Sequence, residues 1–103
     1  MTPSAFKSSL ARHAPPAGLA PALAALWWAG KDDWDKAHAI VMDAEDDKDC
    51  ALVHAYLHRV EGDLSNAAYW YRQAGQPAAS GQLAAEWDEI AKVLTMKSER
   101  AAR

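Results

Sequence analysis

The feature that most restricts how this chain can fold is a pattern that occurs twice in the sequence. Sliding the sequence by 30 residues places the segment 33–37 (Asp-Trp-Asp-Lys-Ala) on the segment 63–67 (Asp-Leu-Ser-Asn-Ala), and Val41 on Tyr71. Each copy has a small alanine followed one turn later by a large apolar residue, an alternation that lets adjacent helices interlock. Because one helix pair cannot bury its apolar stripe alone, the repeat predicts two antiparallel helical hairpins and a C-terminal capping helix.

The composition also favours helices over sheets. The chain has 24 alanines but only eight β-branched residues, and alanine is the best helix former. Its 103 residues suffice for one domain, and half of them are hydrophobic, which is typical of a folded chain. We therefore expect an all-α domain over residues 19–103. Residues 1–18 are rich in serine, proline and alanine and are predicted to form a flexible N-terminal arm.

Helix boundaries can be predicted from the residues that start and stop helices. Pro21 suits a first helical turn and Gly30 a left-handed stop, which predicts a helix over residues 20–29. Aspartates are good N-caps, and apolar residues recur with helical period after several of them. Further helices are expected from Trp34 to the acidic segment 43–49, from Cys50 to Glu61, from about Leu64 to Ala74, and from Leu83 to about Arg100.

The charge and hydropathy pattern excludes several kinds of partner. Eleven lysines and arginines against 14 acidic residues give a net charge of −3, which disfavours binding to nucleic acid. No apolar run is long enough to cross a bilayer, so no membrane partner is expected. Prolines interrupt the apolar stretch 14–29, unlike a secretory signal, and the single Cys50 cannot form an internal disulfide. We expect a cytoplasmic protein.

Two segments resemble the second-helix signature of tetratricopeptide and SEL-like repeats, in which Gly-Asp-aromatic opens the helix and Trp-Tyr-basic-x-Ala closes it. They are residues 33–37 and residues 62–74, the latter ending in Tyr-Trp-Tyr-Arg-Gln-Ala, and the resemblance covers about residues 20–77. The spacing is shorter than the usual 34 residues, and Asp32 stands where the signature has glycine. The resemblance implies a helical-repeat scaffold that binds a protein or peptide. Residues 54–63 also resemble a group of small bacterial proteins, which implies no function.

Aromatic residues at the edges of the predicted apolar stripes are candidates for a binding surface. Trp27 and Trp28 are adjacent, so one narrow helix face cannot bury both. Large amphipathic rings are typical of binding surfaces, although such rings can also fill an alanine-rich core. We expect a non-catalytic interaction module that binds a protein, a peptide or a second copy of itself through Trp27, Tyr56, Tyr69 and Trp70.

A second group of residues indicates metal chemistry. Cys50, His54 and His58 follow one another at i, i+4 steps and Glu61 lies three residues further, so all four share one helix face. Histidines at this spacing can present two nitrogen ligands to a divalent metal such as zinc, and a thiolate or a carboxylate could add a third. His38 could join them from the preceding helix.

The role of these four residues can be interpreted in two ways, in addition to the interaction module proposed above. In the first, the chain is a small metal-binding protein, or an enzyme that depends on a metal or on these histidines. In the second, the histidines only pack toward the next helix, and their nitrogens are hydrogen-bonded there. The sequence contains no nucleophile elbow and no glycine-rich phosphate loop. We therefore favour an interaction module, without a cofactor, over an enzyme.

Overall fold

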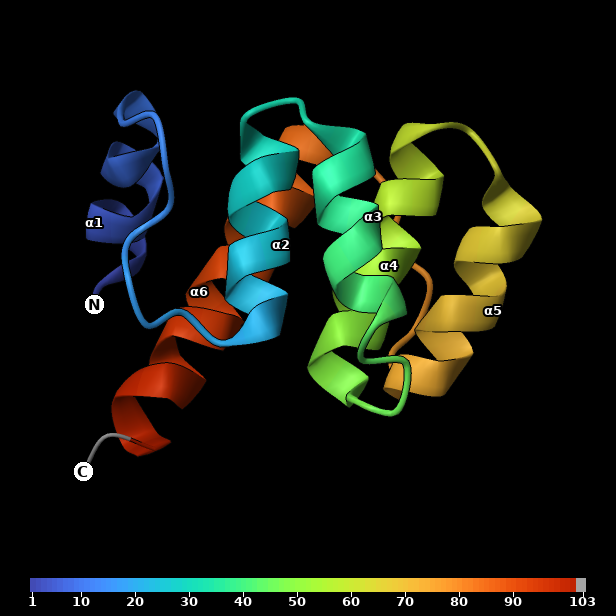
Figure 1. The fold of residues 1–103 in the computed structure, drawn as a ribbon. Helices are drawn as coiled ribbons and strands as arrows, with labels where there is room; N and C mark the ends of the chain where they lie inside the picture. Colours follow the sequence, from blue (N-terminus) through green and yellow to red (C-terminus); the bar gives the residue numbers. More distant parts are fainter. Residues whose placement is uncertain (102–103) are drawn as a thin grey trace.

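Alanine-rich segments bounded by proline, glycine and aspartate fold into helices, as Figure 1 shows. The computed structural model describes residues 1–101, and this range contains no strand, which confirms the all-α prediction. The elements are α1 (Pro3–Ser8), the 3₁₀ helix η1 (Ser9–Ala11), α2 (Pro21–Gly30), α3 (Trp34–Met42), α4 (Lys48–Val60), α5 (Leu64–Ala74) and α6 (Leu83–Ala101).

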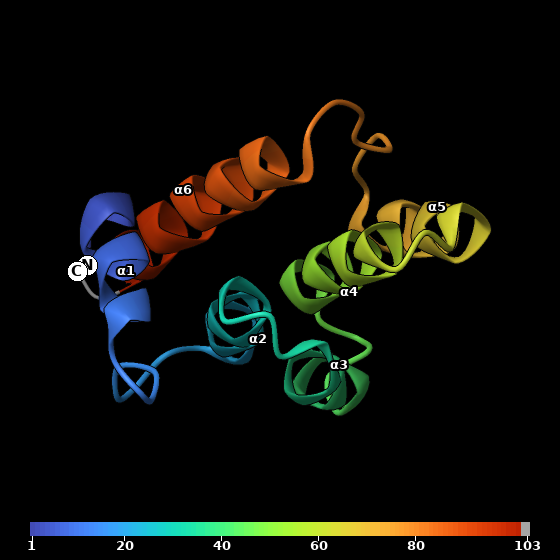
Figure 2. The same ribbon diagram turned by 90° about the horizontal axis from the view of Figure 1, so that it is seen from above.

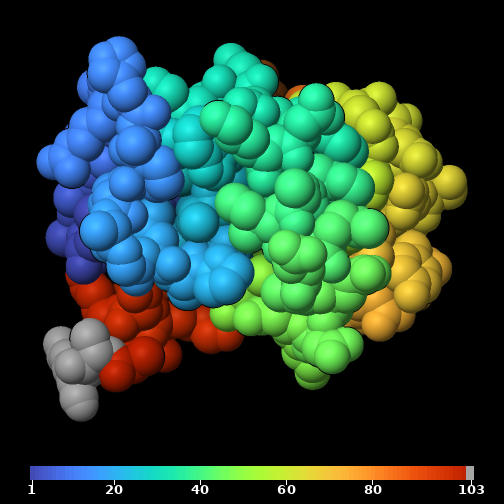
Figure 3. Space-filling view, viewed as in Figure 1, coloured from blue at the N-terminus to red at the C-terminus, as the bar shows by residue number. Residues whose placement is uncertain are grey.

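Four of the helices follow one another side by side, and the last one returns across them. Helix α2 packs on α3, α3 on α4, and α4 on α5, while α6 packs on both α2 and α4. Figure 2 shows α6 on the side of α2 and α4 that faces away from α3, with α1 against α6. In the space-filling view of Figure 3, α2 and α3 form a continuous front between the N-terminal segment and α5.

The turns before α3 and α5 have the same local structure at positions 30 residues apart. Asp33 and Asp63 are the N-caps, and each side chain accepts a hydrogen bond from the backbone N–H three residues later, at 3.2 and 3.3 Å. Each cap residue also donates its own N–H to a carbonyl five residues earlier, at 2.9 Å in both turns. The capping aspartates therefore perform the role that the sequence predicts for them.

Equivalent positions of α3 and α5 also have equivalent burial. Ala37 and Ala67 are buried at the start of their helices, and Val41 and Tyr71 are buried one turn later. The main core lies where α2, α4 and α6 meet, and a second, alanine-rich cluster lies between α4 and α5. Small residues in that cluster allow these two helices to approach closely.

The end of α2 differs from the prediction in one detail. Gly30 is still helical, and Asp32 instead adopts the left-handed conformation, with φ 60°, where the later turn has Gly62 at φ 87°. A Cβ on Gly30 would lie 3.0 Å from Leu10 and 3.1 Å from Trp87. The absence of a side chain on this glycine therefore lets Leu10 and Trp87 pack closely against α2, and the glycine does not reverse the chain direction.

The N-terminal segment, predicted to be an arm, packs onto the helical core. Thr2 caps α1 by accepting a hydrogen bond from the N–H of Ala5 at 3.0 Å. Phe6 is 0% exposed and stacks on Trp87, with 5.7 Å between ring centroids. The segment thus adds a large aromatic residue to the core.

Candidate functional site

Three of the four aromatic residues predicted to bind a partner lie inside the protein. Trp27 is fully buried and donates its indole N–H to the Ser9 hydroxyl at 3.0 Å. Tyr56 and Trp70 are 7% and 8% exposed, whereas Tyr69 is 45% exposed. Of the four, Tyr56 lines a groove that is open to solvent.

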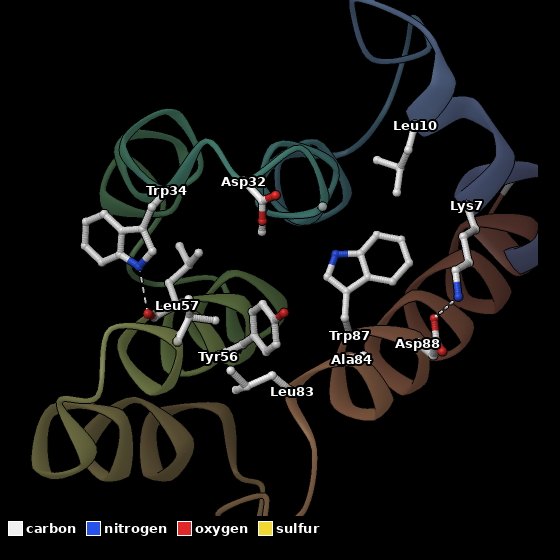
Figure 4. A pocket seen from close by; sticks show the side chains of 13 residues that line it. Lys7, Leu10, Asp32, Trp34, Tyr56, Leu57, Leu83, Ala84, Trp87 and Asp88 are labelled. Atoms are coloured by element: carbon white, nitrogen blue, oxygen red, sulfur yellow. Dashed lines mark hydrogen bonds and ion pairs between the residues drawn. The ribbon is translucent and has the colours of Figure 1, made fainter.

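This groove, which we call the Tyr56 groove, has a volume of about 430 Å³ and is shown in Figure 4. It lies where the N-terminal segment, the turn after α2, the end of α4 and the start of α6 meet. The rings of Tyr56 and Trp87 project into the same opening in Figure 4. Apolar side chains supply most of its wall: Leu10, Trp34, Leu57, Val60 and Leu83.

Charged groups at the rim make the groove acidic. Lys7 and Asp88, which both line it, pair at 2.9 Å and compensate each other. Among residues 1–101, Asp32 has no ion-pair partner. The pKa of the Tyr56 phenol is raised by burial and then by the neighbouring carboxylates, which is consistent with a negative potential at the groove.

A second site is formed by three histidines, which we call the histidine cluster: His38 on α3, and His54 and His58 on α4. The ring centroids are 4.9 Å apart for His38 and His54, 5.3 Å for His38 and His58, and 4.9 Å for His54 and His58. One ring nitrogen from each residue lies within 4.8 Å of the other two. The 3.6-residue helical period places His54 and His58 on one face of α4, and the packing of α3 adds His38.

Two tryptophans hold the cluster in place. Trp34 stacks on His38 at 4.5 Å between ring centroids and donates its indole N–H to the Leu57 carbonyl at 2.7 Å. Trp70, from α5, stacks on His54 at 3.9 Å. Because the aromatic faces restrict rotation of the imidazoles, the cluster has a preorganised arrangement.

The hydrogen bonds of the cluster are incomplete. The Nδ1 atom of His58 lies 2.6 Å from the Glu61 carboxylate. His54 is 1% exposed, and its Nδ1 has no hydrogen-bond partner within residues 1–101. Burial lowers the pKa of His54 to about 4, with smaller contributions from His38 and His58, so that this imidazole is neutral at neutral pH.

The structure separates the residues that the sequence predicts as metal ligands. His54 and His58 come together, and Glu61 reaches the cluster through His58. Cys50 instead packs in the main core, where burial and then Asp47 and Asp49 raise its pKa to about 11. It belongs to no group of converging ligand atoms in the described residues. His38 completes the triad, and its position depends on helix packing that spacing alone does not predict.

We expect the metal-free protein to lose stability as the pH falls from neutral to about 4. The pKa of His54 is about 4 in the folded protein and close to 6.5 in an unfolded chain, so the unfolded state binds the proton first. The stabilisation is complete above pH 6.5 and is lost as the pH falls toward 4, by about 3 kcal/mol. Urea denaturation in chelator at several pH values measures this loss.

The control for this prediction is the variant His54→Phe, which keeps a ring against Trp70. The groups that face His54 are His38 from α3 and His58 from its own helix, while α5 contributes the uncharged Trp70. We expect the free energy of unfolding of this variant to fall less than that of the wild type over the same pH range. Equal losses in both proteins would assign the pH dependence to other groups.

None of the helices in residues 1–101 has the length and apolar character needed to cross a bilayer. Comparisons with known protein families, with curated proteins and with solved structures found no match for this chain.

Proposed function

We propose that the chain is a non-catalytic interaction module whose helix pairs α2–α3 and α4–α5 are tetratricopeptide-like hairpins, with α6 as the capping helix. The matched turns at Asp33 and Asp63 and the matched burial of α3 and α5 support the repeat. The packing of α6 across α2 and α4 supports its capping role. In this proposal the module binds a peptide segment of a partner protein.

The Tyr56 groove is the observation that carries this proposal. It combines a volume of about 430 Å³ with the rings of Tyr56 and Trp87, and aromatic walls of this kind hold the anchor residues of a partner. The Trp87 indole N–H donates to the Leu26 carbonyl at 2.9 Å, which fixes one wall. A preformed wall reduces the entropy cost of binding.

The rim charges define the kind of peptide that fits. Since Lys7 is already paired with Asp88, Asp32 is the lining charge available to a ligand. A peptide with a large apolar residue beside a lysine or arginine would fill the groove and pair with this carboxylate. Such a peptide is the occupant that we propose.

Selection of peptides from a random displayed library on the full chain tests this proposal. We expect enrichment of sequences that join a large apolar residue to a basic one. Ala84 lines the groove whereas the neighbouring Ala85 does not, and both are exposed on α6. Ala84→Trp should therefore weaken binding of a selected peptide at least about tenfold, while Ala85→Trp should leave it unchanged.

Three outcomes would contradict the proposal. The first is selection without any sequence preference. The second is a peptide that binds the Ala84→Trp and Ala85→Trp variants equally well. The third is a dimer in sedimentation velocity that Ala84→Trp alone dissociates, which would make a second copy of this chain the occupant of the groove.

A further inference from the structure

The histidine cluster has the features of a metal-binding site, and it is separate from the Tyr56 groove. Its three imidazoles come from α3 and α4 and approach one another within 4.8 Å at one nitrogen each. Ligand nitrogens around a tetrahedral zinc, at bonds of about 2.0–2.1 Å, lie roughly 3.4 Å apart. Nitrogens at the 4.8 Å limit would therefore have to approach each other by about 1.4 Å to bind one zinc ion.

The unpaired nitrogen of His54 indicates that the cluster is not merely packing. A buried polar atom without a partner costs stability, and nearly all such atoms in folded proteins are satisfied. The Nδ1 of His54 has no partner within residues 1–101, although the ring is 1% exposed. A bound metal ion would take up a lone pair in the cluster and offset the cost of burying it.

The partner of His58 supplies a second, independent indication. A metal-bound histidine almost always gives its other ring N–H to a carboxylate or carbonyl, which fixes the tautomer and strengthens the ligand. The Nδ1 of His58 is 2.6 Å from the Glu61 carboxylate, and in the neutral ring that donates this hydrogen bond the Nε2 carries a free lone pair. Glu61 therefore occupies the position of an orienting group next to the first ligands.

Access and charge also suit a cation. His54 and His58 are buried, whereas His38 is partly exposed and leaves an approach from the α3 side. Glu61, Asp35 and Glu45 are the carboxylates whose fields act on His38, and they make this approach negative. A water molecule could fill a fourth coordination position from this open side.

We propose that His38, His54 and His58 bind one divalent transition-metal ion of the zinc type, with Glu61 as the orienting residue of His58. Three neutral imidazoles favour zinc, cobalt, nickel or copper over calcium or magnesium, which prefer oxygen ligands. The set differs from the sequence expectation in two ways: Cys50 takes no part, and Glu61 acts through His58. His38, which the sequence offered as an additional member, supplies the third nitrogen. The site does not depend on peptide binding.

Titration of the chelator-treated full chain with zinc and with cobalt tests the proposal. We expect one zinc per chain by calorimetry, and for cobalt the visible absorption bands of a tetrahedral site. His38→Gln should weaken zinc binding more than about 100-fold, because loss of even an orienting partner costs about 10–100-fold. Glu61→Gln should weaken it by about 10–100-fold.

Two matched controls separate this site from other zinc ligands. His13 is an exposed histidine outside the cluster, and His13→Gln should leave zinc affinity unchanged. His58, Glu61 and Asp63 form another group of neighbouring ligand atoms, two of them exposed. Asp63→Asn should keep the N-cap of α5 and leave zinc affinity unchanged if the three histidines are the ligands.

Nitrogen-15 NMR of the histidine rings in the wild-type chain provides a readout that needs no variant. Zinc should shift one ring nitrogen of each of His38, His54 and His58, and leave the ring of His13 unshifted. The proposal is overturned if the wild type binds no zinc. It is also overturned if His38→Gln binds as tightly as the wild type, or if Asp63→Asn or His13→Gln abolishes binding.

Discussion

Replacing Phe6 by alanine is expected to destabilise the protein by about 3–5 kcal/mol in the free energy of unfolding. The side chain is 0% exposed and stacks on Trp87 of α6, so its removal leaves a cavity between the N-terminal segment and the core. A flexible arm would instead tolerate this change without loss. Urea denaturation followed by far-ultraviolet circular dichroism gives the difference directly.

The neighbouring Lys7 provides the matched control for this experiment. Its ammonium pairs with Asp88 at 2.9 Å, but both side chains are more than half exposed. Exposed ion pairs of this kind contribute between about 0 and 1 kcal/mol, so Lys7→Ala should change the free energy of unfolding by no more than that. Similar small effects from Phe6→Ala and Lys7→Ala would mean that the N-terminal segment adds little to the core.

The sequence predicts the helices well because local signals determine most of their ends. Asp33 and Asp63 are N-caps as expected, and Gly75 ends α5 in the left-handed conformation at φ 71°. The N-terminal helix shows no such pattern, because a single Phe6 among small and polar residues forms no periodic apolar stripe. Its burial depends on Trp87, which lies some eighty residues away in the chain.

The candidate sites could be predicted only in part, for a related reason. Helical spacing correctly places His54 and His58 on one face, because both residues lie on α4. His38 and Trp70 reach this face from other helices, and spacing within one helix carries no information about such contacts. The Tyr56 groove is built from four separate segments, so no local pattern in the sequence could indicate its shape.

Glu86 is the residue whose loss should have the other large effect on stability. Its carboxylate pairs with Arg59 of α4 at 2.9 Å and accepts a hydrogen bond from the hydroxyl of Tyr71 on α5. The Glu86 and Arg59 side chains are only 7% and 12% exposed, so this ion pair is shielded from water. It therefore connects three helices through one buried group.

We expect Glu86→Ala to lower the free energy of unfolding by about 3–5 kcal/mol, because it leaves the Arg59 cation buried without its partner. Glu89→Ala, on the exposed side of the same helix, should change it by less than about 0.5 kcal/mol. Replacing both partners, as Arg59→Met with Glu86→Leu, should cost less than Glu86→Ala alone, since no charge is then stranded. The single variants Arg59→Met and Glu86→Leu complete this comparison. If the double variant loses as much free energy of unfolding as these two single variants added together, the two charges stabilise the fold independently of each other.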